Sequence, residues 1–333
     1  MSEVLLNVMR GGMVESRHRG DLAVIDVDGK VVFSLGDPHF KTFWRSAAKP
    51  FQALTLVEEG GIERFALSGR ELAVIVSSHG GEEEHTQTVA SVLAKTGCTE
   101  SDLACGPAAP LHPPAAERLM RRNLPFLPLH NPCSGKHSGM LALCKLKGWP
   151  VEGYQRPGHP LQRNTLAVIA EMTATGVSEI TIGVDGCGVP VFGLPISGMA
   201  QAYARLARPG APAGQTRSTA LQIIRQAIVE HPFFVAGTGR LDTALMEVTA
   251  GRVVAKFGAE GVYCAGLAGR GLAMCLKIED GGTRALAPVI IEVMTHLGWL
   301  TDEELVKLEA WRRPLTRNHR GEIVGSLEVA YRF

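Results

Sequence analysis

The sequence predicts an α/β protein in which both ends of the chain contribute strands to one mainly antiparallel sheet. Two observations lead to this fold class. Strand-like segments lie near both ends of the chain, and the apolar residues between them recur at helical spacing. Because no linker separates these regions, we expect one domain over residues 1–333. Its terminal strands, in 1–36 and 252–333, would share a sheet, with flanking helices and an inserted helical, loop-rich region at 50–250.

The expected strands are short runs of apolar and β-branched residues. They lie at 3–11, 21–37, 252–266, 270–282 and 322–333. In the second of them, Asp28-Gly29 separates two apolar runs, which strongly indicates a β-hairpin. The sequence 252–266 and the sequence 270–282 are expected to form a pair of strands.

The expected helices have apolar residues three and four positions apart. They lie at 82–97, 114–123, 136–148, 159–176, 219–232, 286–298 and 301–313. Proline and glycine predict loops at 105–116 and 207–218.

Composition excludes several classes of protein. With 34 basic and 33 acidic residues the net charge is +1, so we expect no nucleic-acid partner. The start, MSEVLLNVMRGG, lacks the regions of a secretion signal, and no apolar stretch approaches the length of a membrane span. The seven cysteines are an odd number at irregular spacings, which favours reduced thiols in the cytoplasm.

Ser46 and Lys49 in WRSAAKPFQ stand nearly one helical turn apart, which places hydroxyl and amine on one face. A lysine kept neutral by burial or by another cation can accept a serine proton. A serine at a helix start followed by a solvated lysine is the simpler reading of these residues alone.

Polar residues also follow the apolar run 72–76, which resembles a strand that leaves a sheet. Ser77, Ser78 and His79 then precede two glycines, and such positions often carry reactive groups. The same small hydroxyls equally suit a turn in which they bond to the backbone.

Two glycine-rich segments bring together metal-ligating residue types. The first, HNPCSGKHSGM at 130–140, contains Cys133, Lys136 and His137, and the second, TIGVDGCGVPVFGLP at 181–195, contains Asp185 and Cys187. Two cysteines suit a soft metal such as zinc but do not define a site. A buried free cysteine and a histidine at a helix start are the structural alternatives.

Lys256 interrupts the apolar run of VVAKFGAEG at 253–261. A lysine in the middle of a strand usually lies on the solvated face. If it pointed inward, it would be a second cation that lowers the pKa of Lys49.

In order, RSAAK, SSHGG, HNPCSGKHSGM, GVDGCGVP and AKFGAEG resemble the signature of the class 3, Rhizobium etli type L-asparaginases over nearly the whole chain. That family is distantly similar to serine β-lactamases, penicillin-binding proteins and serine-dependent glutaminases, so the resemblance implies a fold of their kind. These relatives share a Ser-x-x-Lys start and a late Lys-x-Gly strand. Lys256-Phe257-Gly258 fits the late element, with phenylalanine where threonine or serine is common.

The resemblance implies hydrolysis of L-asparagine to L-aspartate and ammonia by a single catalytic domain, usually a homodimer. It assigns Ser46 as nucleophile with Lys49, and Ser78 with Lys256 as a second pair. The substrate-binding residues that it implies are Arg45, His137, Asp185, His79 and Gly258. It also implies zinc held by Cys133, Lys136 and Cys187, which requires a deprotonated lysine.

Several alternatives stay open from the sequence. Lys277 competes with Lys256 as the second lysine. The same serine-lysine chemistry serves a glutaminase or a β-lactam or peptide amidase, and a non-catalytic receptor for an amino acid or peptide is a rival of another class. A cysteine hydrolase would use Cys133 with His137 or His130.

Overall fold

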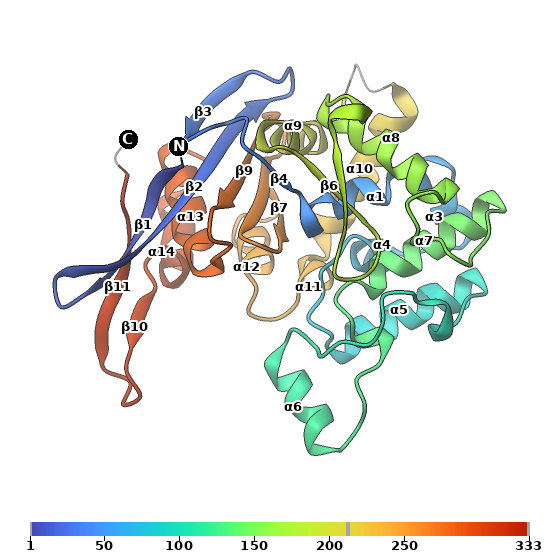
Figure 1. Ribbon diagram of the computed structural model, residues 1–333, viewed down its shortest axis with the longest axis horizontal. Coiled ribbons are helices and arrows are strands. Elements are labelled where there is room, and N and C mark those ends of the chain that lie inside the picture. Colours follow the sequence, from blue (N-terminus) through green and yellow to red (C-terminus); the bar gives the residue numbers. More distant parts are fainter. Residues whose placement is uncertain (1, 211–213, 332–333) are drawn as a thin grey trace.

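The structure, a computed structural model, describes residues 2–210 and 214–331. Its main sheet has eight strands (Figure 1): β1 (Glu3–Arg10), β2 (Met13–Asp26), β3 (Val31–Leu35), β7 (Val253–Gly258), β8 (Val262–Leu267), β9 (Leu272–Ile278), β10 (Leu315–Arg317) and β11 (Ile323–Val329). Their order is β10-β11-β1-β2-β9-β8-β7, with β3 also paired to β2, and all these pairs are antiparallel. The predicted fold class, an α/β protein whose antiparallel sheet is built from both termini, is confirmed.

The hairpin predicted at Asp28-Gly29 is confirmed, because β2 and β3 pair on either side of it. The C-terminal strands differ from the prediction. The segment 252–266 is itself a hairpin, so β7, β8 and β9 replace the expected pair of strands. The turn between β7 and β8 has three residues, 259–261, of which Glu260 and Gly261 have positive φ, +60° and +68°. The expected final strand ends at Val329, and its residues 332–333 lie outside the described residues.

A second sheet of three strands has two of them inside the predicted helical region at 50–250 and one just before it. It contains β4 (Lys41–Phe43), β6 (Pro190–Pro195) and β5 (Thr181–Val184) in that order. Trp44 continues from β4 and donates its backbone N–H to the carbonyl of Phe192, at 2.9 Å. The sheet therefore joins the segment before Ser46 to the turn that carries Asp185 and Cys187.

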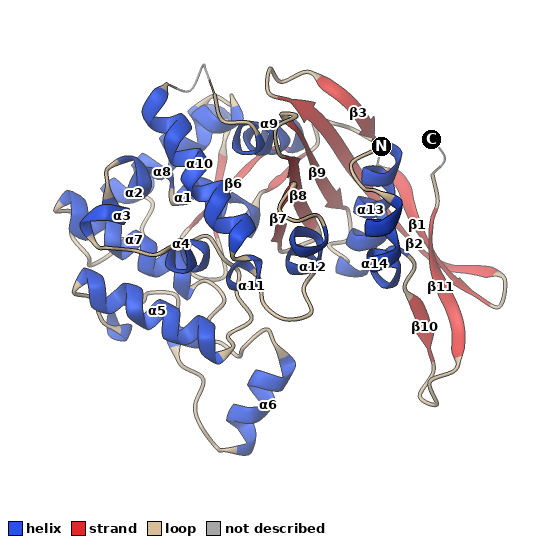
Figure 2. Ribbon diagram, turned by 180° about the vertical axis from the view of Figure 1, so that it is seen from behind, coloured by secondary structure: helices blue, strands red, loops and turns tan. Residues whose placement is uncertain are grey.

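Helices cover both faces of the main sheet. On one face α9 (Ile196–Ala207) packs against β2, β8 and β9, and the other face carries α12 (Leu241–Val248), α13 (Leu286–His296) and α14 (Asp302–Arg312), which stand in front of the strands in Figure 2. The remaining helices lie beside the sheet: α1 (Lys49–Gln52), α2 (Leu54–Glu58), α3 (Gly61–Arg64), α4 (Gly69–Ile75), α5 (Glu83–Thr96), α6 (Pro113–Arg121), α7 (Ser134–Lys147), α8 (Pro160–Thr173), α10 (Gln215–Glu230) and α11 (Pro232–Val235). Short 3₁₀ helices are η1 (Arg45–Ala48), η2 (Glu100–Asp102), η3 (Pro128–His130), η4 (Val177–Glu179) and η5 (Thr283–Ala285). Within the described part of the chain, no helix has both the length and the apolar character needed to cross a membrane.

The seven predicted helices are present with small shifts of their ends. The helices α9 and α12 and the short helices α2, α3, α4 and α11 were not predicted. The loop predicted at 207–218 is shorter, because α10 begins at Gln215, and its residues 211–213 lie outside the described residues.

The strand-like interpretation of 72–76 was wrong, because residues 72–75 belong to α4 and Val76 is its C-cap. Ser68 starts this helix with a capping box: its hydroxyl accepts a hydrogen bond from the Glu71 N–H, and Glu71 Oε2 accepts one from the Ser68 N–H at 2.6 Å. The helix packs against α5, α7, α10 and α11, so it is apolar nearly all round. A short helix that is buried on every side has the same uninterrupted run of apolar residues as a buried strand, so the two cannot be distinguished by periodicity.

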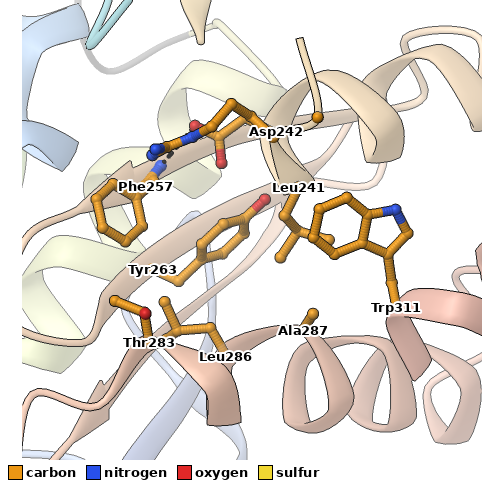
Figure 3. A pocket seen from close by; sticks show the side chains of 10 residues that line it. Leu241, Asp242, Phe257, Tyr263, Thr283, Leu286, Ala287 and Trp311 are labelled. Carbon is orange, nitrogen blue, oxygen red and sulfur yellow. Dashed lines mark hydrogen bonds between the residues drawn. The ribbon is translucent and has the colours of Figure 1, made fainter. Parts of the chain in front are cut away.

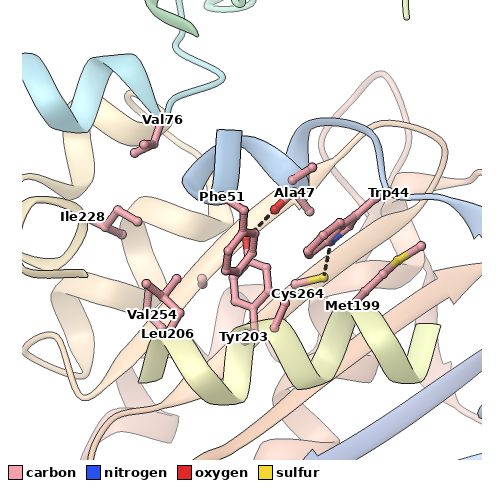
Figure 4. Packing of buried hydrophobic residues seen from close by; sticks show 14 of the residues in the cluster. Trp44, Ala47, Phe51, Val76, Met199, Tyr203, Leu206, Ile228, Val254 and Cys264 are labelled. Atoms are coloured by element: carbon pink, nitrogen blue, oxygen red, sulfur yellow. Dashed lines mark hydrogen bonds between the residues drawn. The ribbon is translucent and has the colours of Figure 1, made fainter. Parts of the chain in front are cut away.

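Aromatic residues hold the segment around Ser46 against the main sheet (Figure 4). The Phe51 ring stacks on Trp44 at 5.1 Å and meets the edge of Tyr203 at 5.4 Å. Tyr203 Oη donates to the Ala47 carbonyl at 2.8 Å, and Trp44 Nε1 donates to Cys264 Sγ at 3.4 Å. Each ring pair contributes about 0.5–1.5 kcal/mol beyond the area it buries, so the backbone next to Ser46 is firmly held.

Candidate active site

Two buried lysines converge on the hydroxyl of Ser78. Lys49 Nζ lies 3.0 Å from Ser78 Oγ, and Lys256 Nζ lies 3.0 Å from the same oxygen. Lys49 also donates to the carbonyls of Ser77 and Pro132, and Lys256 donates to the carbonyl of Phe257. The site thus joins η1–α1, the loop after α4 and strand β7, which are far apart in the sequence.

Both amines have lowered pKa values. Burial lowers the pKa of Lys256 to about 7. The charge of Asp242 opposes this shift, and the charge of Lys49 adds to it. Burial also lowers the pKa of Lys49, opposed by Cys133 and assisted by Lys136. A neutral amine near pH 7 can accept the proton of a hydroxyl, which an ammonium cannot.

Lys277 lies elsewhere. Its Nζ donates to the carbonyls of Glu260 and Ile278, the latter at 2.7 Å, and makes no hydrogen bond to either candidate serine. Of the two lysines considered from the sequence, Lys256 is therefore the one that lies beside Ser78.

Ser46 lies on η1, one turn before Lys49, and is partly exposed. Its hydroxyl makes no hydrogen bond within the described residues, and the Lys49 amine is bonded to Ser78 instead. The preceding residue, Arg45, has φ +53°, a conformation that costs a side-chain-bearing residue about 1–3 kcal/mol. Gly258 on β7 runs alongside: a Cβ there would lie 3.0 Å from the Trp44 carbonyl oxygen, so glycine permits the close approach.

Arg45 and Asp185 form one wall of the site. Asp185 Oδ1 accepts from Arg45 Nε at 3.0 Å and from the Gly186 N–H at 2.8 Å. Burial alone would raise the pKa of Asp185, but the charges of Lys136 and Arg45 lower it below its ordinary value. Oδ2 makes no hydrogen bond within the described residues, so an ionised oxygen is free to accept one from a ligand.

His79 holds the Ser78 loop in place. The Gly81 N–H donates to its Nδ1 at 3.1 Å, and its Nε2 lies 2.8 Å from Ser134 Oγ, which itself donates to Leu129 O. Burial lowers the pKa of His79 well below its ordinary value, so the ring is neutral with its proton on Nε2. Both ring nitrogens are thus hydrogen-bonded to protein groups, and the substrate contact of His79 stays a prediction from the sequence.

His137 has one free ring nitrogen. Its Nδ1 lies 2.6 Å from Tyr154 Oη, which accepts a hydrogen bond from the Ala104 N–H at 2.9 Å. Tyr154 therefore donates to Nδ1, which leaves the proton of the neutral ring on Nε2. Nε2 is buried and has no partner within the described residues. Burial keeps the pKa of His137 well below its ordinary value, so His137 offers a neutral N–H donor.

Cys133, Lys136 and Cys187 also lie together. Lys136 Nζ donates to Cys187 Sγ at 2.9 Å, and the Cys133 and Cys187 side chains interact with each other. The neighbouring Cys187 side chain lowers the pKa of Cys133 well below its ordinary value, and the nearby charges of Lys49 and Lys136 add to this effect. Burial alone would lower the pKa of Lys136, but the two thiols and Asp185 raise it.

These three donors fit a soft divalent metal, since thiolate sulfur is a preferred ligand of zinc. In the described residues no three His, Cys, Asp or Glu side chains are arranged to hold a metal, so the amine of Lys136 would be needed as a ligand. Neither His130 nor His137 is hydrogen-bonded to Cys133 in this part of the chain, so the structure shows no cysteine-histidine pair.

Sequence reasoning missed two residues that support the site. Tyr154 orients His137, and Asp242 Oδ2 lies 3.9 Å from Lys256 Nζ while it accepts the Phe257 N–H at 3.0 Å. Neither belongs to a motif, and each reaches the site only through the fold.

Comparison with known families finds that the family described as L-asparaginase II matches residues 6–329. Comparison with curated proteins finds no match. Among solved structures, the native form of Mglu is 12% identical with a TM-score of 0.48; the match covers 85% of this chain and 64% of that one, so this chain spans less than two thirds of its length. A beta-lactamase from Mycobacterium bovis is 16% identical with a TM-score of 0.40, and the match covers 83% of this chain and 94% of that chain. An octameric penicillin-binding protein homologue from Pyrococcus abyssi is 16% identical with a TM-score of 0.31, and the match covers 84% and 73% of the two chains.

Proposed function

The chain belongs to the L-asparaginase II family, and we propose on this basis that it hydrolyses L-asparagine to L-aspartate and ammonia through an activated serine. The observation that carries the proposal is the cluster in which Lys49 and Lys256 both reach Ser78. Lys49 itself lies one helical turn after Ser46. Two buried amines with lowered pKa values are the proton acceptors that serine chemistry needs near neutral pH.

In the proposed mechanism Ser46 Oγ attacks the side-chain amide carbon of asparagine, and its proton passes to Lys49. Ser78 connects Lys49 to Lys256, so that a proton can move between the two amines. A protonated lysine then donates to the amide nitrogen, the C–N bond breaks, and ammonia leaves an ester on Ser46. Water attacks this ester with the same amines as base, which releases aspartate and restores the serine hydroxyl.

The substrate would be held by its two charged groups. Asp185 Oδ2 is suited to the α-ammonium group, and it is already ionised beside Arg45. The free Nε2–H of His137 and the guanidinium of Arg45 are suited to the α-carboxylate. Glutamine is longer by one methylene, a difference worth about 1–3 kcal/mol in a fitted pocket.

We also propose that zinc is bound by Cys133, Lys136 and Cys187. When bound, its divalent charge would help to position the substrate. Lys136 must lose its proton to serve as a ligand, so zinc binding is expected to release protons and to strengthen as the pH rises. The homodimer and the cytoplasmic location remain predictions from the sequence.

The zinc proposal predicts that Cys133→Ala loses the metal and raises KM more than it lowers kcat, because the serine and lysines remain. Metal content of the purified protein measures the first effect, and initial rates of ammonia release measure the second. Cys98→Ala, which removes a buried thiol outside the cluster, should retain both metal and KM. A Cys133→Ala protein with an unchanged KM and no turnover would contradict a positioning role.

The lowered pKa of Lys256 predicts an acidic limb in the pH profile of kcat/KM. The protonated amine cannot accept a proton, so activity should fall as the pH drops through about 7, by about tenfold for each further pH unit. Asp242 raises the pKa of Lys256, so Asp242→Asn should move the limb to lower pH. A limb that stays in place in Asp242→Asn would show that another group controls it.

The proposed function is tested by ammonia release from L-asparagine, with and without zinc, and with L-glutamine in parallel. Preferential turnover of L-asparagine is expected. Preference for glutamine, or hydrolysis of a chromogenic β-lactam, would indicate a related amidohydrolase. Stoichiometric acylation without turnover would indicate a receptor.

A further inference from the structure

A second pocket lies beside β7, among α12, α13 and α14 (Figure 3). Its volume is about 240 Å³, and it is lined by side chains that include Arg240, Asp242, Phe257, Tyr263, Leu286 and Trp311. Phe257 and Tyr263 are paired across β7 and β8, so they share one face of the sheet. Neighbouring residues of a strand point to opposite faces, so Phe257 faces this pocket while Lys256 faces the candidate active site.

Three polar groups in the pocket lack full partners. Asp242 Oδ1 and Tyr263 Oη are buried and make no hydrogen bond within the described residues, and both side chains are almost completely buried. Tyr263 Oη points toward Asp242, and burial together with the nearby carboxylate raises the pKa of Tyr263. Arg240 lies over the Phe257 ring, with its guanidinium carbon 4.9 Å from the centroid, and has no hydrogen bond or ion pair in the described part of the chain. Buried polar groups without partners are rare in folded proteins and are explained by a bound molecule or water.

We propose that this pocket binds a small α-amino acid with an uncharged apolar side chain. The α-ammonium group would lie at Asp242 Oδ1 and Tyr263 Oη, and the α-carboxylate would lie at the edge of the Arg240 guanidinium. Leu241, Leu286 and Trp311 would surround the side chain.

The chemistry of the walls supports this class of ligand. Opposite charges on neighbouring positions of the wall match a zwitterion, whereas a simple anion or amine would leave one of the two charges without a partner. The volume is below the range of pockets that hold drug-sized molecules, about 300–1,000 Å³, and suits a single amino acid. Leu241, Leu286 and Ala287 form an apolar wall, which suits an apolar side chain better than the amide of asparagine.

The pocket is joined to the candidate active site through Asp242. One oxygen of this carboxylate is buried and has no partner among the described residues, while the other accepts the Phe257 N–H and lies 3.9 Å from Lys256 Nζ. An ammonium group at the free oxygen therefore shares its carboxylate with the active-site lysine. The proposal goes beyond the proposed hydrolysis, and it is tested by binding alone.

L-Leucine is the probe, titrated into the full-length protein by isothermal calorimetry. We expect saturable binding of one leucine per chain. Arg240→Gln should weaken it at least tenfold, and Ala287→Phe, which fills the pocket from α13, should abolish it. Arg270→Gln removes an exposed arginine outside the pocket and should leave the affinity within twofold, as should Asp185→Ala, which alters only the proposed substrate site.

Two analogues test the recognition of both charges. 4-Methylpentanoate lacks the ammonium group and 3-methylbutylamine lacks the carboxylate, and each should bind at least tenfold more weakly than leucine. Absence of saturable binding at millimolar leucine, equal binding of the three compounds, or loss of binding in Asp185→Ala but not in Arg240→Gln would overturn the proposal. Thermal unfolding of each variant checks that the fold is retained.

Discussion

Replacing Ser46 with alanine should lower kcat for L-asparagine by about 10⁴-fold or more, because loss of a covalent nucleophile removes the acyl-enzyme route. The fold should be unaffected, since the Ser46 hydroxyl makes no hydrogen bond within the described residues. Steady-state ammonia release measures the loss, and thermal unfolding checks the structure.

Ser78→Ala is the matched variant, because Ser78 is the serine that both lysines contact. If Ser78 transfers protons and Ser46 forms the ester, Ser78→Ala should lose about 10²- to 10³-fold in kcat, within the range of proton-transfer catalysis. Peptide mass spectrometry after acid quenching should still place the acyl group on Ser46. Retained turnover in Ser46→Ala together with complete loss in Ser78→Ala would reassign the nucleophile to Ser78.

Lys49→Met should lower kcat by about 10²- to 10⁴-fold, because it removes the base next to Ser46 and one of the two amines on Ser78. Methionine is apolar and fills much of the same space, so it can pack in the buried site without the free-energy cost of burying an amine. The carbonyls of Ser77 and Pro132 lose a donor, so a modest loss of stability is also expected. Rates are compared at the pH optimum of each protein.

Lys277→Met is the control for this experiment. Lys277 is also a buried lysine that donates to two backbone carbonyls, but it makes no hydrogen bond to Ser46 or Ser78. It should lose less than tenfold in kcat. An equal loss of kcat in both variants would mean that removing any buried lysine near β7 lowers activity by destabilising the protein. The proposed role of Lys49 as a base would then be contradicted.

Most of the fold could be predicted because its long elements have a clear period. The amphipathic helices and the hairpin at Asp28-Gly29 are examples. Two of the errors involve segments that are buried on nearly every side, 72–76 and α9. Residues 72–76 are apolar throughout, and α9 is a run of small and apolar residues that starts directly after a strand, so neither shows which face meets the solvent.

For the candidate site, too, some features are visible as motifs in the sequence and others depend on contacts made only in the folded chain. The Ser-x-x-Lys spacing and the two cysteine segments are visible in the sequence, and the structure brings their residues together. The partner of Lys49 is not visible, because it depends on how the loop after α4 packs against η1. The free nitrogen of His137 depends on Tyr154, and the use of both nitrogens of His79 depends on Gly81 and Ser134.

The sequence by itself determined the antiparallel sheet from both termini, the residue types of the site and the membership of the L-asparaginase II family. These follow from periodicity and from motifs that are local in the chain. Only the tertiary structure decided which amine meets which hydroxyl, that Lys256 is buried, and that Asp242 lies between this lysine and a second pocket. Hydrogen bonds and pKa values depend on distance and burial, and residues 178 positions apart, such as Ser78 and Lys256, meet only in the folded chain.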